Sequence, residues 1–468
     1  MIFHSLTYLV FLLIVLAVYW SVSLRWQNVF LLVASYVFYG WEHPWFLLPL
    51  WASTVVDWAC ALAMDRWPHR RRAFLLVSVC GSLALLGTFK YANFFLDNLD
   101  TLLATFGARP WEVALRLALP VGISFYTFQS IGYVVDVYRG HVPAERSLLK
   151  YALYVTFFPQ LVAGPIERAS HMLPQFSDHR YFNAELWRNA LGLMLWGYLK
   201  KVVIADNCAI IANKIFALSS PSFPVLWAGV LAFTVQIYAD FSAYTDIARG
   251  TARLLGFELM RNFLHPYLAT SPADFWRRWH ISLSTWMRDY LYIPLGGSRC
   301  SPGRNSFNLV ATFAISGLWH GASWNFVIWG FYWGFLLLLE RGWSALGWKK
   351  RLPWLIKVAG TFLLACIGWL MFRERSLPQL IHDLTLSPLA CTRRDWAMGL
   401  YFGILVCLYS LPLAVHMLFS GVFPRWNLRF DLPEPRRFIF DTAIGVALFM
   451  GILTLRSLTT SDFIYFQF

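Results

Sequence analysis

Two histidines in strongly apolar sequence are the residues best suited to carry chemistry. His280 lies within DFWRRWHISLSTWMRDYLYIPLGG (residues 274–297), and His320 lies within GLWHGASWNFVIWG (residues 317–330). An ionisable side chain at membrane depth is costly, so it marks a functional site by default. Imidazole takes up and returns a proton near neutral pH. The two positions therefore indicate proton-transfer chemistry inside a bilayer.

The element expected to position His280 is a helix over residues 271–290. Ser271 is the expected N-cap, with Pro272 at the first helical position. Helical periodicity then gives an aromatic face and an opposite face of Arg277, His280, Ser284 and Arg288. This pattern suits a helix at the membrane surface or in the wall of a cytoplasmic vestibule. An anchoring helix, in which His280 is an incidental polar residue, remains an equal alternative.

His320 lies between two apolar runs, where Gly317 and Gly321 permit close backbone packing or a kink. We expect it at the floor of a cavity near mid-membrane. A core histidine that is hydrogen-bonded to a carbonyl group is the alternative interpretation. Two further acidic residues, Asp240 and Asp246, also need partners near an apolar run. Asp246 can pair with an arginine three positions later, Arg249, which favours a structural ion pair there.

The composition predicts an integral membrane protein. Of the 468 residues, 58% are hydrophobic, 18% aromatic and only 14% charged, and the mean hydropathy is +0.52. The apolar runs are continuous and do not alternate, which favours helices over barrel strands. We therefore predict an all-α, polytopic bundle of roughly 11 to 13 spans with re-entrant or interfacial helices. The formal charge is +14, and the basic residues are scattered through short loops. This distribution indicates that they set the orientation of the spans, and it argues against nucleic-acid binding.

Apolar runs predict the positions of the spans. They are expected near residues 6–22, 28–41, 45–63, 73–93, 118–137, 150–166, 186–204, 225–247, 305–322, 324–346, 354–372, 398–420 and 438–455. The first run has no cleavage site after it, so it is expected to be retained. Basic loops after alternate spans, including 66–72, 349–351 and 425–437, predict that both termini face outward. Prolines and glycines in 156–186 and 256–304 predict irregular segments around a cavity.

The sequence has no repeat at a fixed period and no linker, which predicts one domain over residues 1–468. It has no HExxH, CxxC, GxSxG or phosphate-loop motif, and its seven cysteines form no paired spacing. These absences argue against a metal site, a disulfide framework, a serine hydrolase and a nucleotide-driven transporter. The chain is accordingly expected to bind no metal and no resident cofactor.

Several long motifs, in order along nearly the whole chain, resemble one family. They are FPQLVAGPIER (158–168), YADFSAYTDIA (238–248), the two histidine motifs and the closing FIYFQF (463–468). Together they resemble the membrane-bound O-acyltransferase family, and within it the bacterial alginate O-acetyltransferase branch. The resemblance implies a helical fold with a cytoplasmic funnel and a narrow tunnel, and an acyltransferase core over about residues 118–346. Its family histidine matches His320, and a second family position matches His280.

The resemblance also implies a set of residue roles and partners. His320 and His280 are the expected catalytic residues. The expected donor funnel consists of Trp276, Arg278, Trp279, Arg288, Asp289, Trp319 and Asn325. The expected donor is a thioester, acetyl-coenzyme A or an acyl carrier protein, and a periplasmic or extracellular acetyltransferase is the expected partner. The predicted location is the bacterial inner membrane.

The predicted activity is transfer of an acyl group, expected to be acetyl, for O-acetylation of an extracytoplasmic polysaccharide. Peptidoglycan O-acetylation and teichoic-acid D-alanylation are alternatives within the same class. A transporter in which the histidines relay protons is an alternative from another class, although it predicts inverted repeats that the sequence does not show. The second alternative from another class is a non-catalytic membrane scaffold that recruits a soluble transferase.

Overall fold

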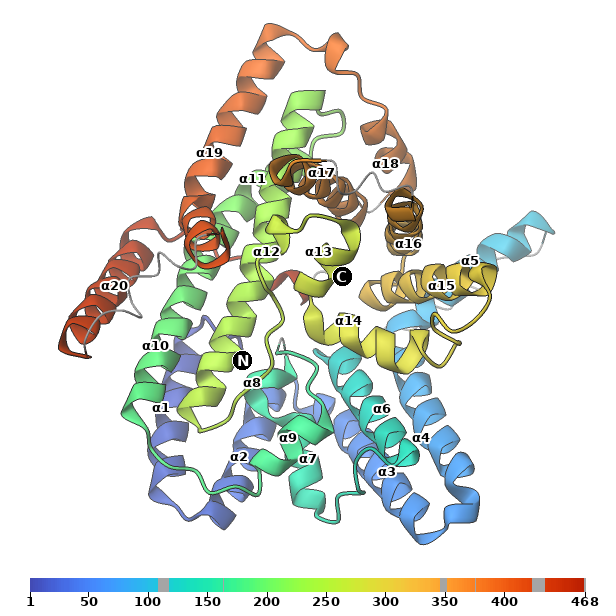
Figure 1. Cartoon of the computed structure of the whole chain (residues 1–468), viewed down its shortest axis with the longest axis vertical. Helices are drawn as coiled ribbons and strands as arrows, with labels where there is room; N and C mark the ends of the chain where they lie inside the picture. The colour runs from blue at the N-terminus through green and yellow to red at the C-terminus, as the bar shows by residue number, and fades with distance from the viewer. Residues whose placement is uncertain (108–117, 163, 346–351, 375, 423–433, 467–468) are drawn as a thin grey trace. The chain divides into compact units, whose positions relative to one another are not determined.

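A computed structural model describes residues 1–107, 118–162, 164–345, 352–374, 376–422 and 434–466 (Figure 1). Within these ranges the regular structure is helical and no strand is present. Among the described residues, six helices are long and apolar enough to cross a bilayer: Pro44–Arg66, Pro68–Thr105, Phe223–Leu254, Trp354–Arg373, Arg393–Val422 and Phe438–Leu455. The predicted all-α, polytopic membrane fold is therefore confirmed. The predicted basic loop at 349–351 and much of the one at 425–437 lie outside the described residues.

The chain divides into two compact units. Unit 1 comprises Met1–Trp187 and Thr251–Met260, and unit 2 comprises Arg188–Gly250 and Arg261–Phe468. The two units are defined by how residues pack within each of them. This division does not test the predicted single domain, which stays a prediction.

Unit 1 contains a group of three helices that pack on one another: α3 (Leu47–Arg66), α4 (Arg71–Leu86) and α6 (Ile123–Arg139) (Figure 1). Asp57 of α3 is buried between them and accepts hydrogen bonds from Ser78 and Ser82 of α4. A carboxylate in this position is tolerated because hydroxyl donors replace the water that it loses. The remaining described helices of unit 1 are α1 (Leu6–Ser21), α2 (Leu24–Gly40), α5 (Ala92–Thr105), α7 (Leu148–Thr156), α8 (Phe158–Leu161) and α9 (Ala169–Gln175).

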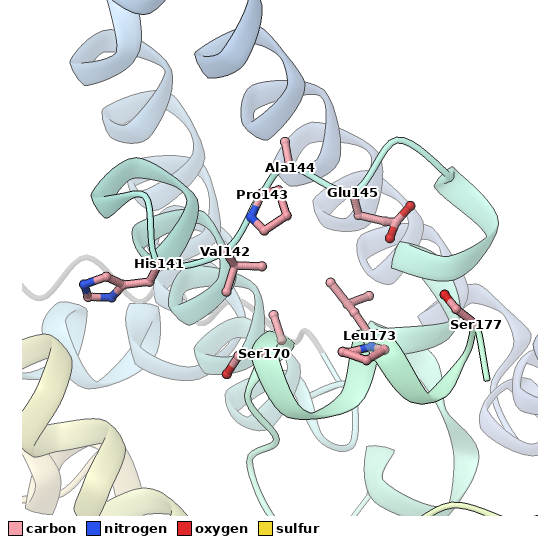
Figure 2. Close-up of a pocket in the computed structure, with 10 residues that line it drawn as sticks. His141, Val142, Pro143, Ala144, Glu145, Ser170, Leu173 and Ser177 are labelled. Carbon is pink, nitrogen blue, oxygen red and sulfur yellow. The ribbon is translucent and has the colours of Figure 1, made fainter.

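The span predicted at 150–166 is two short helices, because α7 ends at Thr156 and α8 begins at Phe158, one residue before Pro159. This break agrees with the irregular segment predicted at 156–186. A pocket of about 360 Å³ lies nearby between the 141–145 loop and α9, with Glu145 and Ser177 on its wall (Figure 2).

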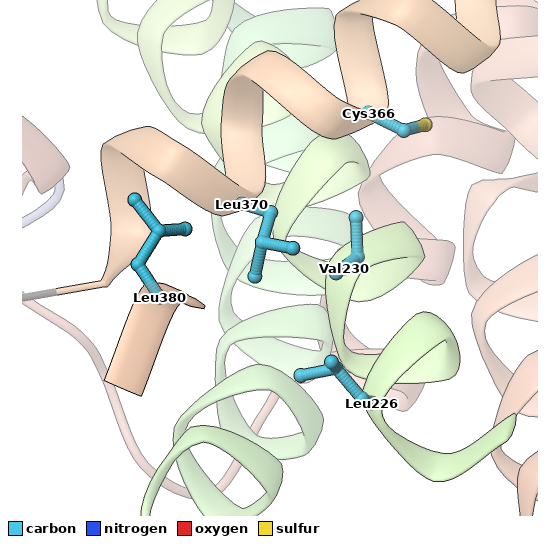
Figure 3. Packing of buried hydrophobic residues seen from close by; sticks show 5 residues of the cluster. All are labelled: Leu226, Val230, Cys366, Leu370 and Leu380. Carbon is cyan, nitrogen blue, oxygen red and sulfur yellow. The ribbon is translucent and has the colours of Figure 1, made fainter. Parts of the chain in front are cut away.

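Unit 2 is organised along α12 (Phe223–Leu254), most of which it contains. Leu226 and Val230 of α12 pack with Cys366 and Leu370 of α17 (Trp354–Arg373) and with Leu380 of α18 (Leu377–Leu384), as Figure 3 shows. Every side chain of this cluster is at most 5% exposed. Lipid tails are as apolar as these side chains, so close van der Waals packing, and not removal from water, holds α17 against α12.

The other helices of unit 2 are α10 (Ala184–Leu199), the π-helical turn η4 (Lys200–Ala205), α11 (Asp206–Phe216), α13 (Pro272–Arg278), α14 (Ile281–Met287), α15 (Pro302–His320), α16 (Trp324–Ala345), α19 (Arg393–Met417) and α20 (Glu434–Leu455). Of these, α15 and α16 form the most extensive helix pair (Figure 1).

The single helix predicted over residues 271–290 is wrong in one respect. The helix start is as expected, since the Ser271 hydroxyl accepts from the Asp274 amide and Pro272 is the first helical residue. The chain then breaks at His280, where φ is 42°, and continues as α14 and the π-helical turn η6 (Arg288–Tyr292). A left-handed residue ends the helical hydrogen-bond ladder. The predicted shared face of Arg277, His280, Ser284 and Arg288 therefore does not exist.

Candidate active site

The backbone around His280 is held in its left-handed conformation by the segment that precedes α13. The Ile281 amide donates to the Asn262 carbonyl oxygen at 2.9 Å, and the Leu264 amide donates to the Arg278 carbonyl oxygen at 2.9 Å. The Ser282 hydroxyl also donates to the Asn262 side-chain oxygen at 2.6 Å. A left-handed conformation costs a non-glycine residue about 1–2 kcal/mol. It persists because bonds on both sides of His280 fix the chain.

The His280 side chain is completely buried, with 0% exposure. Its ring centroid lies 4.7 Å from that of Phe241 on α12 and 6.3 Å from that of Trp319 on α15. The residue lies outside the six long apolar helices. Burial lowers the pKa of His280 to about 3, because the charged imidazolium loses its hydration. His280 is therefore neutral at pH 7.

His320 is the last residue of α15 and is 4% exposed. Three aromatic rings surround its imidazole, with centroids at 5.0 Å for Trp319, 5.1 Å for Trp329 and 5.4 Å for Phe372. Trp329 and Phe372 meet it nearly edge-to-face, at 87° and 75°. Such an aromatic enclosure gives the imidazole a low-dielectric setting in which polar interactions are strengthened.

Two glycines allow α15 and α16 to approach each other next to His320. A Cβ atom on Gly317 would lie 2.0 Å from the Phe326 carbonyl oxygen, and one on Gly321 would lie 2.1 Å from the Phe326 ring. No side chain fits at these distances. The close packing that the sequence predicted at Gly317 and Gly321 is therefore confirmed, and it places His320 against α16.

Tyr465, in the short helix η11 (Ile464–Phe466), connects the two histidines. Its ring centroid lies 5.7 Å from that of His320 and 6.4 Å from that of His280. No role for Tyr465 was predicted from the sequence. The closing FIYFQF motif supplied a signal, because it places a lone phenol among apolar rings; its last two residues, Gln467 and Phe468, lie outside the described residues.

The comparisons with known proteins identify the family. The model of MBOAT, the membrane-bound O-acyltransferase family, matches residues 33–374. The chain belongs to the membrane-bound O-acyltransferase family. It is therefore a multi-pass membrane O-acyltransferase, as the sequence predicted.

Relatives of this acyltransferase are named for three polymers: alginate, peptidoglycan and teichoic acid. The chain is 43% identical to the probable alginate O-acetylase AlgI of Pseudomonas aeruginosa, over 81% of this chain and 73% of that protein. It is 39% identical to the protein of the same name from Pseudomonas putida, over 100% of both chains. It is 38% identical to the peptidoglycan O-acetyltransferase of Helicobacter pylori, over 76% of this chain and 73% of that one.

Three tryptophans predicted for the donor funnel of the acyltransferase lie close to the histidines. Trp319 contacts both rings, at centroid distances of 6.3 Å for His280 and 5.0 Å for His320. Trp276 packs edge-on against Trp329, which itself contacts His320. Trp279, next to His280, is 1% exposed. The structure thus gathers the tryptophans of this set into a buried aromatic wall around the site.

The four polar residues predicted for the funnel have other immediate contacts. Arg278 pairs with Asp274 at 2.9 Å. Arg288 pairs with its neighbour Asp289 at 2.7 Å, and the Arg288 side chain is 60% exposed. The buried Asn325 amide donates to the Glu374 carbonyl oxygen at 2.5 Å, which ties α16 to the end of α17. These contacts are structural, and a role in donor binding stays a prediction.

Proposed function

We propose that this membrane O-acyltransferase passes an acetyl group from a cytoplasmic thioester to an acceptor hydroxyl and so across the membrane, for O-acetylation of an extracytoplasmic polysaccharide. The observation that carries the proposal is the meeting of His280, His320 and Tyr465 in one buried aromatic site. The acetyl group is supported by the names of the more similar relatives, which are O-acetylases of alginate or O-acetyltransferases of peptidoglycan.

In the proposed reaction, His320 is the general base. Its imidazole accepts the proton of the attacking hydroxyl as the oxygen forms a bond to the acyl carbon. The bond from that carbon to the thioester sulfur then breaks, and the proton passes from His320 to the departing thiolate. A base in this position contributes about 10²–10⁴ to the rate. The aromatic rings around His320 exclude water that would otherwise hydrolyse the thioester.

His280 acts as a neutral imidazole in this scheme, because its pKa of about 3 keeps it uncharged at pH 7. It orients the reacting groups beside Tyr465 and does not attract the donor by charge. Attraction of an anionic donor such as acetyl-coenzyme A is assigned instead to the net charge of +14, which raises the local concentration of anions.

The setting proposed for the enzyme is the bacterial inner membrane, with both termini outward and the donor on the cytoplasmic side. A separate extracytoplasmic acetyltransferase completes delivery to the polymer. Teichoic-acid D-alanylation is the rival within this class and would use a carrier protein as donor. A transporter or a scaffold would leave acyl transfer independent of His320.

The test is transfer of labelled acetyl from acetyl-coenzyme A in proteoliposomes that contain the protein and its candidate partner. We expect His320→Ala to lose transfer by at least about 10². His416→Ala, which removes another histidine of unit 2, serves as the matched control and should retain transfer. Equal transfer by wild type and His320→Ala would overturn the catalytic assignment in favour of a scaffold. Transfer only from an aminoacylated carrier protein would replace acetylation by D-alanylation.

A further inference from the structure

Unit 2 contains a buried cluster of charges that the proposed reaction does not use. The Lys201 ammonium lies 2.9 Å from a carboxylate oxygen of Asp240 and 3.0 Å from one of Asp206. The three side chains are 0–1% exposed. Ionisable groups inside a membrane protein are expensive to bury, so they are retained mainly where they have a function.

The same cluster binds the segment of residues 457–465, which we call the strap. The Lys201 ammonium donates to the Ser461 carbonyl oxygen at 2.8 Å. The Ser461 hydroxyl donates to Asp206 at 2.6 Å, and the Ile464 amide donates to Asp240 at 2.7 Å. Each of the three charged residues therefore bonds the strap directly: Lys201 and Asp206 through Ser461, and Asp240 through Ile464.

The first residue of the strap also bonds η4, the π-helical turn that carries Lys201. The Ser457 amide donates to the Val202 carbonyl oxygen at 2.9 Å, so the strap is held by η4 at its start and by the charge cluster at its end. The last of these bonds is made by Ile464, and the next residue is Tyr465. A shift of the strap by one residue would place a different side chain between His280 and His320.

We propose that Lys201, Asp206 and Asp240 are positioning residues that seat Tyr465 between the two histidines of the active site. The inference rests on the proposed function for its activity readout. A lysine ammonium has three N–H donors, and here it lies beside two carboxylates and the Ser461 carbonyl. The surroundings of Lys201 are therefore complete only when the strap is in place.

A purely stabilising role accounts poorly for this cluster. Buried ion pairs are weak contributors to stability, because desolvation offsets much of their attraction, and apolar residues often replace them without loss. Directional hydrogen bonds instead fix the register of the strap, that is, which strap residue lies beside each charged side chain. The π-helical turn η4, which carries Lys201, is also a form that recurs at functional sites.

The adjacent lysine provides a matched control. Lys200 is also buried, at 3% exposure, and its ammonium lies 2.7 Å from Asp246 and 2.8 Å from the Ser242 hydroxyl. Asp246 and Asp240 both belong to α12. In the described part of the chain, no hydrogen bond or ion pair joins Lys200 to the strap. Lys200→Met and Lys201→Met thus each remove an ion pair to α12. Lys201→Met also removes the pair to Asp206 of α11 and the bond to the strap.

The experiment measures two properties of the purified full-length protein: amide hydrogen exchange of the 457–465 peptide by mass spectrometry, and acetyl transfer in proteoliposomes. In Lys201→Met we expect exchange of this peptide to be about tenfold faster and kcat to fall about tenfold, with the donor KM nearly unchanged. In Lys200→Met both quantities should stay within about twofold of wild type. Lys201→Arg, which keeps the charge, should recover part of the loss.

Ser461→Ala provides a second route if Lys201→Met does not fold, because it removes only the hydroxyl, which donates to Asp206 at 2.6 Å and accepts from the Lys201 ammonium at 3.3 Å. We expect exchange of the strap and kcat to change by about threefold. The proposal is overturned if neither variant loosens the strap, if Lys200→Met loosens it equally, or if a loosened strap leaves kcat unchanged. Hydrogen exchange needs no acyl transfer, so an inactive wild type with the expected exchange pattern would refute the proposed function and retain the positioning of the strap.

Discussion

The two histidines of the site are both buried, at 0% exposure for His280 and 4% for His320, and they are positioned in opposite ways. His320 ends a regular helix of 19 residues that packs closely on α16 through glycines. His280 occupies a left-handed break between two helices of seven residues each. The first position is fixed by helix packing, and the second is fixed by local hydrogen bonds that maintain a strained backbone.

This difference means that mutations can separate the role of each histidine side chain from the contacts that fix its backbone. A substitution at His320 changes the side chain and leaves an unstrained helical backbone. A substitution at His280 changes the side chain and also the cost of the left-handed conformation. Tyr465 and Trp319 contact both rings, so they are the residues through which the two positions are joined.

The largest effect is expected for His320→Gln. The change keeps a polar side chain but removes the group that accepts a proton, so acetyl transfer should fall by at least about 10². The thermal unfolding midpoint in detergent should change little, because Gln is a good helix former. Loss of transfer together with a large fall in the midpoint would indicate that His320 acts through packing, and would remove the contrast with His280.

The next effect concerns Tyr465, which links the two positions. Tyr465→Ala removes the ring that contacts both histidines, and we expect transfer to fall by about tenfold or more. Tyr465→Phe keeps the ring and removes only the hydroxyl. Transfer rates of the two variants, measured side by side, divide the contribution of Tyr465 into ring and hydroxyl. Wild-type transfer by Tyr465→Ala would show that the strap does not complete the site.

The pH dependence of stability should distinguish His280 from the rest of the chain. Its pKa is lowered by burial from the usual 6.5 to about 3, so between these values the unfolded chain binds a proton that the folded chain excludes. The stability due to neutral His280 is therefore complete above pH 6.5 and is lost as the pH falls toward 3, by up to about 1.4 kcal/mol per pH unit.

The measurement compares unfolding midpoints of wild type and His280→Asn at pH 7.5 and pH 5. Wild type should lose more stability than the variant on acidification. Parallel losses would mean that water reaches His280 in the folded protein and that its pKa is near the usual value.

Much of the fold followed from local features of the sequence. Continuous apolar runs predicted the long helices, Ser271 and Pro272 predicted the start of α13, and Gly317 with Gly321 predicted the close packing beside His320. Each of these features acts within a few residues of the chain, so periodicity and side-chain size were sufficient to find it.

The features that the sequence did not predict depend on contacts between distant segments. The break at His280 requires Asn262 to bond the far side of the turn, and no residue type at position 280 signals it. Lys201 and Tyr465 lie far apart in the chain, and the folded strap links them, because Ser461 bonds Lys201 and Tyr465 lies against His320. Asp246 does lie near Arg249, at 3.8 Å, but its shorter contact of 2.7 Å is with Lys200, which local spacing did not reveal.

The smallest effect is the most direct test of the contrast between the two backbones. At position 280, Asn should be more stable than Ala by about 1 kcal/mol, because Asn tolerates the left-handed conformation and Ala does not. At position 320 the order should reverse, with Ala more stable than Asn by about 0.5 kcal/mol, because Ala is the better helix former. Unfolding midpoints of the four variants are measured under one condition. Both positions are buried, so each pair shares the loss of the imidazole and the cost of burying the Asn amide, and a reversal of order between the two pairs reports the backbone. The same order at both positions would mean that His280 is not held in a left-handed break, and the two histidines would then be positioned in the same way.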